Sequence, residues 1–274
     1  MRIAIYRKTI APENEVYMNQ LLRELADNHV EVVDCYTHPG KLEGPIDMLL
    51  SIGGDGTMLD AVPLVGDSGI PMLGINMGRL GFISSVAKEE IHQAIQQILE
   101  GRYSTESRTL LELVSPQGVF HDKVNYALNE INIIRNPEHS LLSVKVFVND
   151  VFLNTYWGDG ILMATPTGST AYSLSAGGPI LTPDSHSFVI TPIAAHNLTV
   201  RPIVIPDDSE VRIHVEGREK KFVFSMDSRV CALDTSVELV VRKADFCIHT
   251  VRMEGTDFFS TIRNKLMWGK DNRN

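Results

Sequence analysis

The sequence predicts a protein of two domains, an α/β domain with a parallel sheet followed by a β-rich, mainly antiparallel domain. Within residues 1–102, strand-like apolar runs alternate with segments in which apolar residues recur at helical spacing. Such alternation is typical of a parallel sheet with helices on its faces. From residue 103 onward the runs are short and separated by turn residues, as in antiparallel sheets. We therefore expect domains at 1–102 and 103–250, followed by a C-terminal segment 251–274 whose helix packs back onto them.

The elements of the first domain follow from periodicity and from stop signals. Gly101 ends a segment with apolar residues on one side, which predicts a helix that stops there. Pro63 is expected to interrupt the helix that contains it. We expect strands at 2–6, 30–36, 48–52 and 71–75, and helices at 13–28, 57–65 and 88–101.

The second domain is predicted from short β-branched runs. Asn149 and Asp150 are turn residues between two of them. Residues 257–268 place Phe258, Phe259, Ile262 and Leu266 on one helical face. We expect strands at 110–114, 127–134, 142–148, 151–156, 188–193, 211–215, 222–226 and 237–241, and a terminal helix at 257–268.

Composition and charge narrow the class of protein. The 274 residues are 43% hydrophobic, which is typical of a soluble globular protein with a sizeable core. No apolar run approaches the roughly 20 residues of a membrane span, and the start of the chain resembles a strand, not a signal peptide. A net charge of −9 argues against a nucleic-acid partner. Cys35, Cys231 and Cys247 are far apart and odd in number, so we expect no disulfide framework and a cytoplasmic location.

The first motif is a glycine-rich turn at the end of an apolar run. Its glycines let another molecule approach the main chain, and a helix start suits nucleotide phosphates. Asp55, the carboxylate in the turn, would be repelled by phosphates unless a divalent cation or a proton to abstract lay between them. We expect a phosphoryl-transfer site centred on Asp55, with these residues in the phosphate-donor loop: Gly53, Gly54, Gly56 and Thr57.

Three further motifs support a ligand site. Residues 74–82 form either a second backbone cradle, with Arg79 near a phosphate, or an ordinary turn. Residues 157–160 repeat the Gly-Asp-Gly pattern. The small-residue segment 164–179 is better explained as a nucleoside-binding segment, in which Tyr172 could stack on a base, than as a loop that only caps a helix. Asn129 and Glu130 could grip two ribose hydroxyls if their strand ends or bulges at that point; alone they would be interpreted as solvated surface.

Several classes of site have no motif in this chain. There is no P-loop, no protein-kinase signature and no dinucleotide fingerprint. The nine histidines show no metal-ligand spacing, so no residue is assigned to a metal.

Together, these motifs resemble the NAD kinase family in order and spacing. The resemblance covers nearly the whole chain, although the first motif alone is shared by diacylglycerol-type lipid kinases and, as a close variant, by 6-phosphofructokinases. The matching segments are 53–57, 129–130, 158–160 and 165–172.

The resemblance implies a Rossmann-like N-terminal domain, a β-rich C-terminal domain and a site between them. It implies transfer of a phosphoryl group from ATP, or from polyphosphate in some members, to the 2′-hydroxyl of the adenosine ribose of NAD. The resemblance also implies a divalent cation, Mg²⁺, and a homodimer or homotetramer. Neither nucleic acid nor membrane is an expected partner.

The family's roles transfer by motif position. Asp55 matches the proton acceptor, and Asp159 matches the carboxylate near the nicotinamide end. The implied NAD-binding residues are Asp55, Gly56, Asn129, Glu130, Asp159, Thr170, Ala171, Tyr172, Ser173, Leu174, Ser175, Ala194 and Arg229.

Two positions depart from the usual bacterial pattern. Trp157 stands where many relatives carry Arg or Lys, and a large residue there resembles members that prefer NAD over NADH. Arg229 stands where many relatives have Gln or His, so its contact could be with phosphate.

Two other classes of protein stay open. One is a lipid or sugar kinase that shares the first motif, although no basic helix or basic cluster is found for it. The other is a non-catalytic NAD-binding module.

Overall fold

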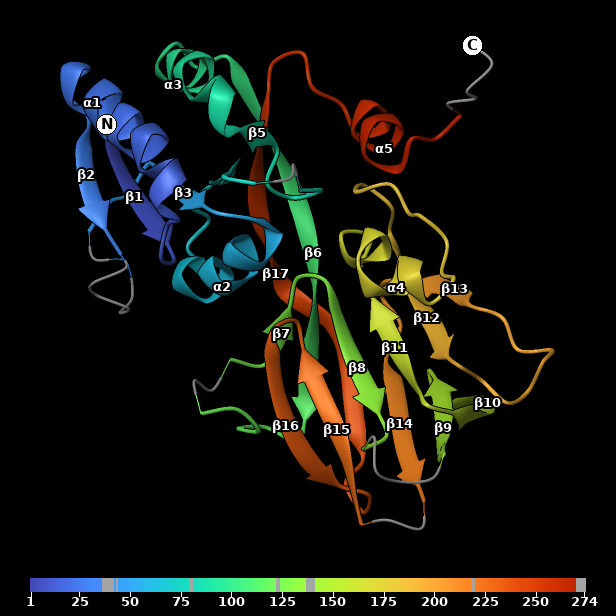
Figure 1. The fold of residues 1–274 in the computed structure, drawn as a ribbon. Coiled ribbons are helices and arrows are strands. Elements are labelled where there is room, and N and C mark those ends of the chain that lie inside the picture. Colours follow the sequence, from blue (N-terminus) through green and yellow to red (C-terminus); the bar gives the residue numbers. More distant parts are fainter. Residues whose placement is uncertain are drawn as a thin grey trace. The chain divides into compact units, whose positions relative to one another are not determined.

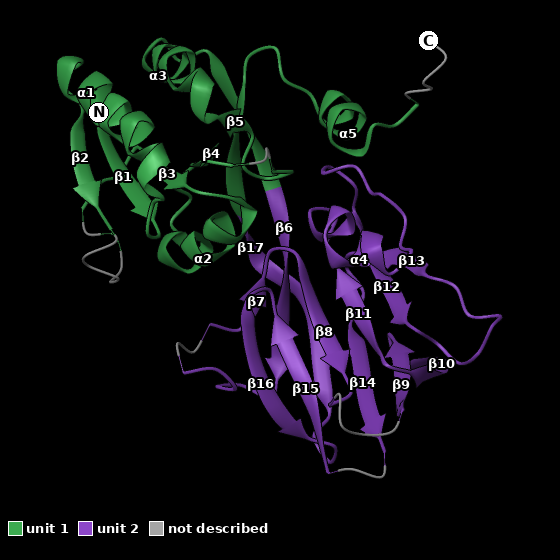
Figure 2. Cartoon of the chain, in the orientation of Figure 1, with its two compact units in different colours: residues 1–107, 248–274 green, residues 108–247 purple. Residues whose placement is uncertain are grey.

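The computed structural model describes residues 1–35, 42, 44–78, 81–121, 124–136, 141–217 and 220–269. Tyr36, at the end of an expected strand, and Arg79 lie outside these ranges. The chain forms two compact units (Figure 2), unit 1 of residues 1–107 and 248–274 and unit 2 of residues 108–247. Unit 1 is a Rossmann-like α/β structure and unit 2 is predominantly antiparallel β, so the predicted fold class is confirmed.

Unit 1 is built on a parallel sheet with helices on both faces (Figure 1). Its elements are β1 (Arg2–Arg7), η1 (Pro12–Asn14), α1 (Glu15–Asp27), β2 (Glu31–Asp34), β3 (Met48–Ile52), α2 (Asp55–Val65), β4 (Met72–Asn76), β5 (Val86–Ala87), η2 (Lys88–Glu90), α3 (Ile91–Leu99) and α5 (Phe258–Leu266). The strands lie in the order β4-β3-β1-β2, all parallel, and β5 also pairs with β4. Two long strands, β6 (Tyr103–Ser115) and β17 (Leu239–Met253), run from one unit into the other.

The core of unit 1 explains why these segments form a sheet covered by helices. All five residues of β3 are buried, as expected for a central strand of a parallel sheet. Helices α1 and α3 pack beside each other on one face, and α2 covers the other (Figure 1). The helical spacing in α1 and α3 buries Leu21, Leu25, Ile91 and Ile95 against the strands.

Helix α2 differs from the expectation in two ways. It begins at Asp55, inside the glycine turn, and it continues through Pro63 without a break. A proline in a helix loses one hydrogen bond to the fourth preceding residue. Here that loss falls in the last turn, where the N–H of Gly66 still reaches the Val62 carbonyl at 2.9 Å and ends the helix.

Unit 2 is a pair of antiparallel sheets. Its other elements are β7 (Tyr126–Ala127), β8 (Glu130–Ile134), β9 (Leu142–Val148), β10 (Val151–Gly158), β11 (Gly160–Ala164), η3 (Gly168–Thr170), α4 (Tyr172–Ser175), β12 (Ser187–Ile193), β13 (Ile203–Pro206), β14 (Val211–Glu216), β15 (Lys221–Met226) and β16 (Arg229–Asp234). One sheet has the order β13-β12-β11-β8-β15-β16. The other contains β10-β9-β14-β17, with β6 pairing with β17 and β7.

The sheets of unit 2 share one apolar core. Alternate residues of β9, such as Val144 and Val146, and of β15, such as Phe222 and Phe224, are buried in it. Asn149 and Asp150 both have positive φ, so the predicted turn between β9 and β10 is a tight hairpin. The sequence pattern did not predict β11, β13 or β16.

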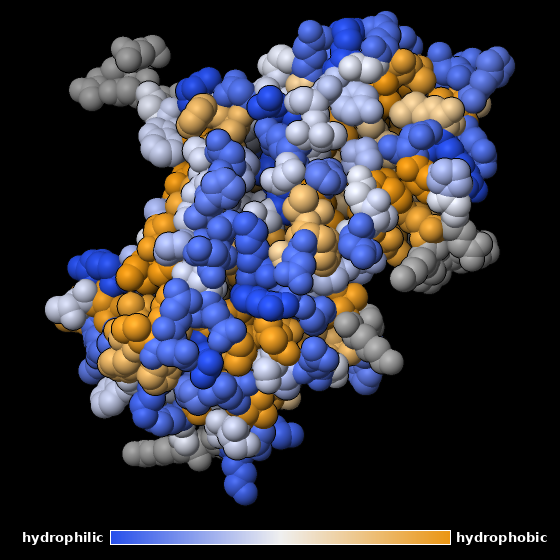
Figure 3. Space-filling model, turned by 180° about the vertical axis from the view of Figure 1, so that it is seen from behind, coloured by the Kyte–Doolittle hydropathy of each residue, from blue (hydrophilic) through white to orange (hydrophobic). Residues whose placement is uncertain are grey.

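Exposed apolar side chains gather on the hairpin of β9 and β10. Val151 is 69% exposed, Phe152 55% and Trp157 54%. Strand β10 ends the order of its sheet, so one of its edges has no strand partner among the described residues. Figure 3, a view from behind, shows hydrophobic surface at the lower left, the side of unit 2 on which β10 lies. No helix of the described residues has both the length and the apolar character needed to cross a bilayer.

Candidate functional site

The glycine turn joins β3 to α2 at the carboxyl end of the parallel sheet. Gly53 has φ of 155°, and a Cβ there would lie 2.2 Å from Thr57 Oγ1, so the protein's own packing requires this glycine. Gly54 and Gly56 are exposed, and a Cβ on either would meet nothing within 4 Å. Since glycine is a poor helix residue, packing alone does not explain Gly56 in the first turn of α2. The open space over both glycines leaves the helix N-terminus accessible to a phosphate.

Asp55 is held by a loop that follows β4. Its Oδ2 accepts the N–H of Phe82 at 2.7 Å, and its Oδ1 accepts those of Ile83 at 3.2 Å and Ser84 at 2.8 Å. Gly81 makes this possible, because a Cβ there would lie 1.7 Å from Asp55 Oδ1. Three successive amides, at the end of the second glycine cluster and just after it, therefore orient Asp55. Its Oδ2 keeps one lone pair for a further hydrogen bond.

Asn129 and Glu130 lie where one strand ends and the next begins. Strand β7 stops at Ala127 and β8 starts at Glu130, so the condition for the two side chains to act together is met. The residues are only 6% and 8% exposed, so this pair is not part of the solvated surface. Asn129 Oδ1 and Glu130 Oε2 are buried without a hydrogen-bond partner among the described residues. Each such group costs about 1–3 kcal/mol, which favours a ligand that supplies the missing hydrogen bonds.

Asp227, which sequence reasoning missed as a site residue, fixes this pair from the turn between β15 and β16. Its carboxylate accepts the N–H groups of Leu128 at 2.8 Å, Asn129 at 2.8 Å and Glu130 at 3.2 Å. Burial raises the pKa of Asp227 while these hydrogen bonds oppose the change. Burial, reinforced by the Asp227 charge, raises the pKa of Glu130 to about 8, against a hydrogen bond from the Tyr172 N–H.

The small-residue segment folds back onto the same stretch of main chain. Thr165 donates its N–H to the Asn129 carbonyl at 2.9 Å and its hydroxyl to the Leu128 carbonyl at 2.6 Å. A Cβ on Gly168 would lie 2.1 Å from Asn129 O, so this close approach requires glycine. The structure thereby brings Tyr172, the first residue of α4, beside Glu130.

The second Gly-Asp-Gly motif differs physically from the first. A Cβ on Gly158 would lie 2.8 Å from Ile193 O, and one on Gly160 2.0 Å from Ile133 O, so both glycines accommodate neighbouring strands. Asp159 is paired with Arg135, at 2.6 Å between Oδ1 and Nε. The Asp159 N–H donates to the Ile193 carbonyl at 3.0 Å, so Asp159 lies close to the next residue, Ala194. Ala194 is exposed and has a positive φ of 44°.

Arg229 is turned toward its own unit. Its guanidinium donates to the Val124 carbonyl at 2.8 Å and to the Tyr126 carbonyl, and lies 5.4 Å from the centre of the Phe120 ring. These contacts support the main chain that leads to Asn129. A contact of Arg229 with ligand stays a prediction.

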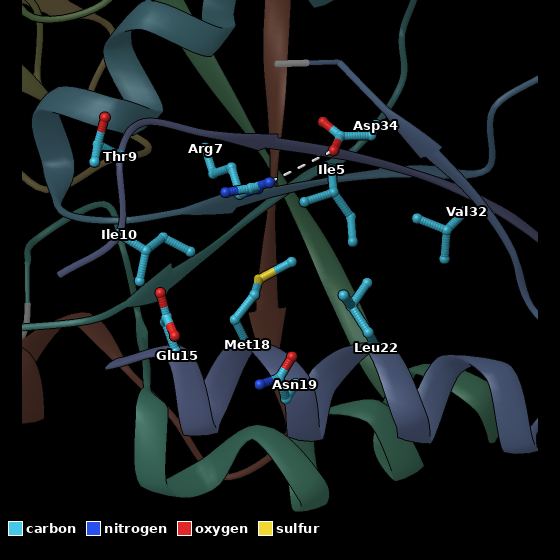
Figure 4. A pocket seen from close by; sticks show the side chains of 10 residues that line it. All are labelled: Ile5, Arg7, Thr9, Ile10, Glu15, Met18, Asn19, Leu22, Val32 and Asp34. Atoms are coloured by element: carbon cyan, nitrogen blue, oxygen red, sulfur yellow. Dashed lines mark ion pairs between the residues drawn. The ribbon is translucent and has the colours of Figure 1, made fainter. Parts of the chain in front are cut away.

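Unit 1 also contains a cavity that the sequence does not predict. It measures about 470 Å³ and lies between α1 and the strands β1 and β2. Figure 4 shows apolar side chains of α1 facing it, with the ion pair of Arg7 and Asp34 at its edge, 3.7 Å between Nη2 and Oδ2. None of the predicted site residues lines it; the lining residues are Ile5, Arg7, Thr9, Ile10, Glu15, Met18, Asn19, Leu22, Val32 and Asp34.

An open glycine turn at a helix start in unit 1, and the buried Asn129 Oδ1 and Glu130 Oε2, which have no hydrogen-bond partner among the described residues, are features expected of a nucleotide-binding protein. Models of the ATP-NAD kinase N-terminal and C-terminal domains match residues 37–103 and 128–253. The chain belongs to the NAD kinase family.

Individual relatives agree with this assignment. The NAD kinase of Flavobacterium johnsoniae is 43% identical over 294 residues, covering 100% of both chains, and that of Bacteroides fragilis is 45% identical over 227 residues, covering 83% of this chain and 78% of the relative. The crystal structure of yeast NADH kinase complexed with NADH has a TM-score of 0.85 at 27% identity, covering 99% of this chain and 89% of that one. The structure of an NAD kinase from Archaeoglobus fulgidus in complex with ATP shares the fold, with a TM-score of 0.79 at 24% identity over 97% of this chain and 99% of that one.

Proposed function

We propose that this chain is an NAD kinase, which transfers the terminal phosphoryl group of ATP to the 2′-hydroxyl of the adenosine ribose of NAD. The observation that carries the proposal is the match of both halves of the chain to ATP-NAD kinase domains. In the reaction a bond forms between the ribose O2′ and the γ-phosphorus, and the bond from that phosphorus to the bridging oxygen of ADP breaks. The hydroxyl proton needs an acceptor, and NADP and ADP are the products.

Unit 1 supplies the donor side of the proposal. The donor phosphates bind at the start of α2, over the open surface of Gly54 and Gly56, with Gly53 and Thr57 shaping the turn. Asp55 accepts the hydroxyl proton through the remaining lone pair of Oδ2. Its orientation is supported by the fixed loop amides, which suits a reaction that depends mainly on positioning and charge.

Unit 2 supplies the acceptor side. Asn129 and Glu130 bind the ribose hydroxyls, which satisfy their unpaired atoms. Asp159 binds near the nicotinamide end, while Asp55 and Gly56 of unit 1 also contact NAD. The remaining proposed NAD contacts are Thr170, Ala171, Tyr172, Ser173, Leu174, Ser175, Ala194 and Arg229.

A divalent cation, Mg²⁺, is proposed as the cofactor. The described residues contain no group of three His, Cys, Asp or Glu side chains that could hold a metal alone. Mg²⁺ keeps several waters and is commonly held in large part by substrate phosphates, which fits donor phosphates bound at an open helix start without a dedicated protein cage. When bound, the ion would neutralise phosphate charge.

We also propose a homodimer or homotetramer. The support is the edge strand β10, which exposes Val151, Phe152 and Trp157, because apolar edges are commonly covered in assemblies. Light scattering after size exclusion would measure the mass, and a monomer at micromolar concentration would contradict the proposal. The cytoplasm is the proposed location, and neither nucleic acid nor membrane is a proposed partner.

One assay tests the proposed activity. Purified protein is incubated with NAD, Mg²⁺ and either ATP or inorganic polyphosphate, and NADP is measured with an NADP-specific dehydrogenase. We expect NADP with ATP; the polyphosphate arm defines donor range, and NADH in place of NAD tests the preference predicted from Trp157. Absence of NADP with both donors would overturn the proposal in favour of a lipid or sugar kinase or a non-catalytic NAD-binding module.

A further inference from the structure

The last turn of α5 places a lysine beside the loop that holds Asp55. Lys265 Nζ lies 4.2 Å from the centre of the Phe82 ring. Phe82 is the residue whose N–H binds Asp55 Oδ2 at 2.7 Å. Helix α5 is capped by Asp257, whose Oδ1 accepts the Ser260 N–H at 2.8 Å, and it buries Ile262. All of these residues belong to unit 1.

Lys265 is half-buried, and no ion pair joins it to a carboxylate of the described residues. Burial lowers its pKa, and the nearby charge of Asp55 partly opposes this. Placing an ammonium group in such a position is unfavourable, and the Asp55 charge compensates for it only in part. The Phe82 ring contributes a cation–π interaction, but it leaves the donor hydrogens of the ammonium group free for an anion.

Two other lysines of unit 1 are committed elsewhere. Lys8 pairs with Asp60 on α2, and this hydrogen bond raises its pKa. Lys88 binds Asn14 Oδ1 at 2.9 Å and lies 5.0 Å from the centre of the Tyr17 ring. Lys265 differs from them because its described surroundings are Phe82 and the carboxylate proposed as the base.

We propose that Lys265 is a ligand of the donor phosphates and supplies the positive charge that lets them approach Asp55. This inference rests on the proposed function, in which an anionic donor must come close to an anionic base. A cation beside the loop of residues 82–84 weakens that repulsion and stabilises the charge that develops on the transferred group. Lys265 is then a specific determinant of donor affinity, contributed by the C-terminal helix.

The test compares three variants of the full chain. Lys265→Met keeps an unbranched apolar side chain and removes the charge, and Lys265→Arg keeps the charge. Arg263→Met removes one charge from an exposed position of the same helix. Binding of MgATP, and separately of inorganic tripolyphosphate, is measured by calorimetry, together with the KM values for ATP and NAD. Circular dichroism melting checks that each variant is folded.

We expect Lys265→Met to weaken MgATP and tripolyphosphate binding by about 10- to 100-fold, the range of a charged hydrogen bond. The KM for ATP should rise similarly, while that for NAD stays within about twofold. Lys265→Arg should retain most of the affinity, and Arg263→Met should match the wild type. Equal MgATP affinities for Lys265→Met and Arg263→Met would overturn the inference.

The binding measurement separates this inference from the proposed activity. If the wild type makes NADP while Lys265→Met binds MgATP normally, the role of Lys265 is wrong and the activity stands. If the wild type makes no NADP but Lys265→Met loses MgATP affinity, the activity is wrong and the phosphate ligand stands. A folded Lys265→Met whose KM for NAD rises as much as its KM for ATP would also contradict a donor-specific role.

Discussion

The carboxylate of Asp227 and the main chain of Glu130 are joined by a hydrogen bond of 3.2 Å, across 97 positions of the sequence. Asp227 also binds the two preceding N–H groups, so one side chain fixes three successive residues. Asp55 holds the loop of residues 82–84 in the same way. In each unit, therefore, a carboxylate at a turn binds three successive N–H groups of a distant segment. Of the two carboxylates, only Asp55 is proposed to take part in the reaction.

Replacing Asp227 with Asn should loosen the stretch that carries Asn129 and Glu130. The amide places N–H donors against main-chain N–H groups that now face a carboxylate. We expect the free energy of unfolding to fall by about 1–3 kcal/mol, as when buried donors lose an acceptor. Urea unfolding measures this, and NAD affinity should fall as well. Asp245→Asn changes a side chain that is 90% exposed and should leave both quantities unchanged; equal behaviour of the two variants would contradict the role of Asp227.

Glu130 should make folding stability depend on pH. Its pKa is raised from 4.5 to about 8 in the folded protein, by burial first and by Asp227 second. The folded state therefore holds a proton that the unfolded state releases between these values. The stabilisation that Glu130 contributes to the folded state is fully present below pH 4.5 and is lost as the pH rises toward 8. The free energy of unfolding should fall over this range by up to about 1.4 kcal/mol per pH unit. Glu130→Gln should remove this dependence on pH. The measurement is the free energy of unfolding of both proteins at each pH, and the difference between them should change with pH over this range.

The same group should make NAD affinity depend on pH in the opposite sense. Ribose hydroxyls donate to the ionised carboxylate, so binding below pH 8 requires the loss of a proton. Between pH 6 and 7.5 we expect affinity to rise with pH by up to about tenfold per unit. Calorimetric titration measures it, with Glu130→Gln as a weaker, pH-independent control. An affinity of the wild type that is flat over this range would show that Glu130 is not the ribose ligand, or binds it protonated.

Much of the fold was predictable because it depends on local patterns. The apolar run of β3 and the hairpin marked by Asn149 and Asp150 were read correctly from the sequence. Strand β11 was missed because its first residue, Gly160, and its last, Ala164, belong to two segments that were both interpreted as ligand-binding turns. The interruption predicted at Pro63 was wrong, because a missing hydrogen bond near a helix end costs too little to break it.

The candidate site was predictable where its residues lie in compact motifs. Asn129 and Glu130 were found by their place among other motifs, whereas their burial is set by Asp227 and Thr165, far along the chain. No local pattern marks Asp227, because its partners are main-chain amides. The sequence also does not show why a given position is glycine. Gly160 lies against a neighbouring strand, whereas Gly56 faces open space, and only the tertiary structure distinguishes the two cases. The assigned ligand contacts and the domain limits at 102 and 250 stay predictions.

Asp55→Asn tests the proposed proton acceptor. The amide keeps the size of the side chain but cannot take a proton at neutral pH, so kcat should fall by about 10²–10⁴-fold. NAD affinity should stay within a small factor, since Asn129 and Glu130 are the proposed ribose ligands. Initial rates of NADP formation and calorimetry with NAD measure the two effects. Asp67→Asn, at an exposed position just after α2, is the matched control; turnover of Asp55→Asn near that of the control would exclude the role.

Gly56→Ala and Gly160→Ala should change stability in opposite directions. Gly56 lies in the first turn of α2 with nothing within 4 Å of its missing Cβ, so alanine should raise the free energy of unfolding by about 0.4–1 kcal/mol. A Cβ on Gly160 would lie 2.0 Å from Ile133 O, so alanine there must displace a strand and lower stability. If Gly56 is glycine because donor phosphates approach its main chain, its stabilised variant should bind MgATP at least about tenfold more weakly, since the new methyl group occupies that approach. A Gly56→Ala protein that is more stable and binds MgATP as well as the wild type would show that the donor phosphates do not approach the main chain at Gly56, because the added methyl group would block that approach.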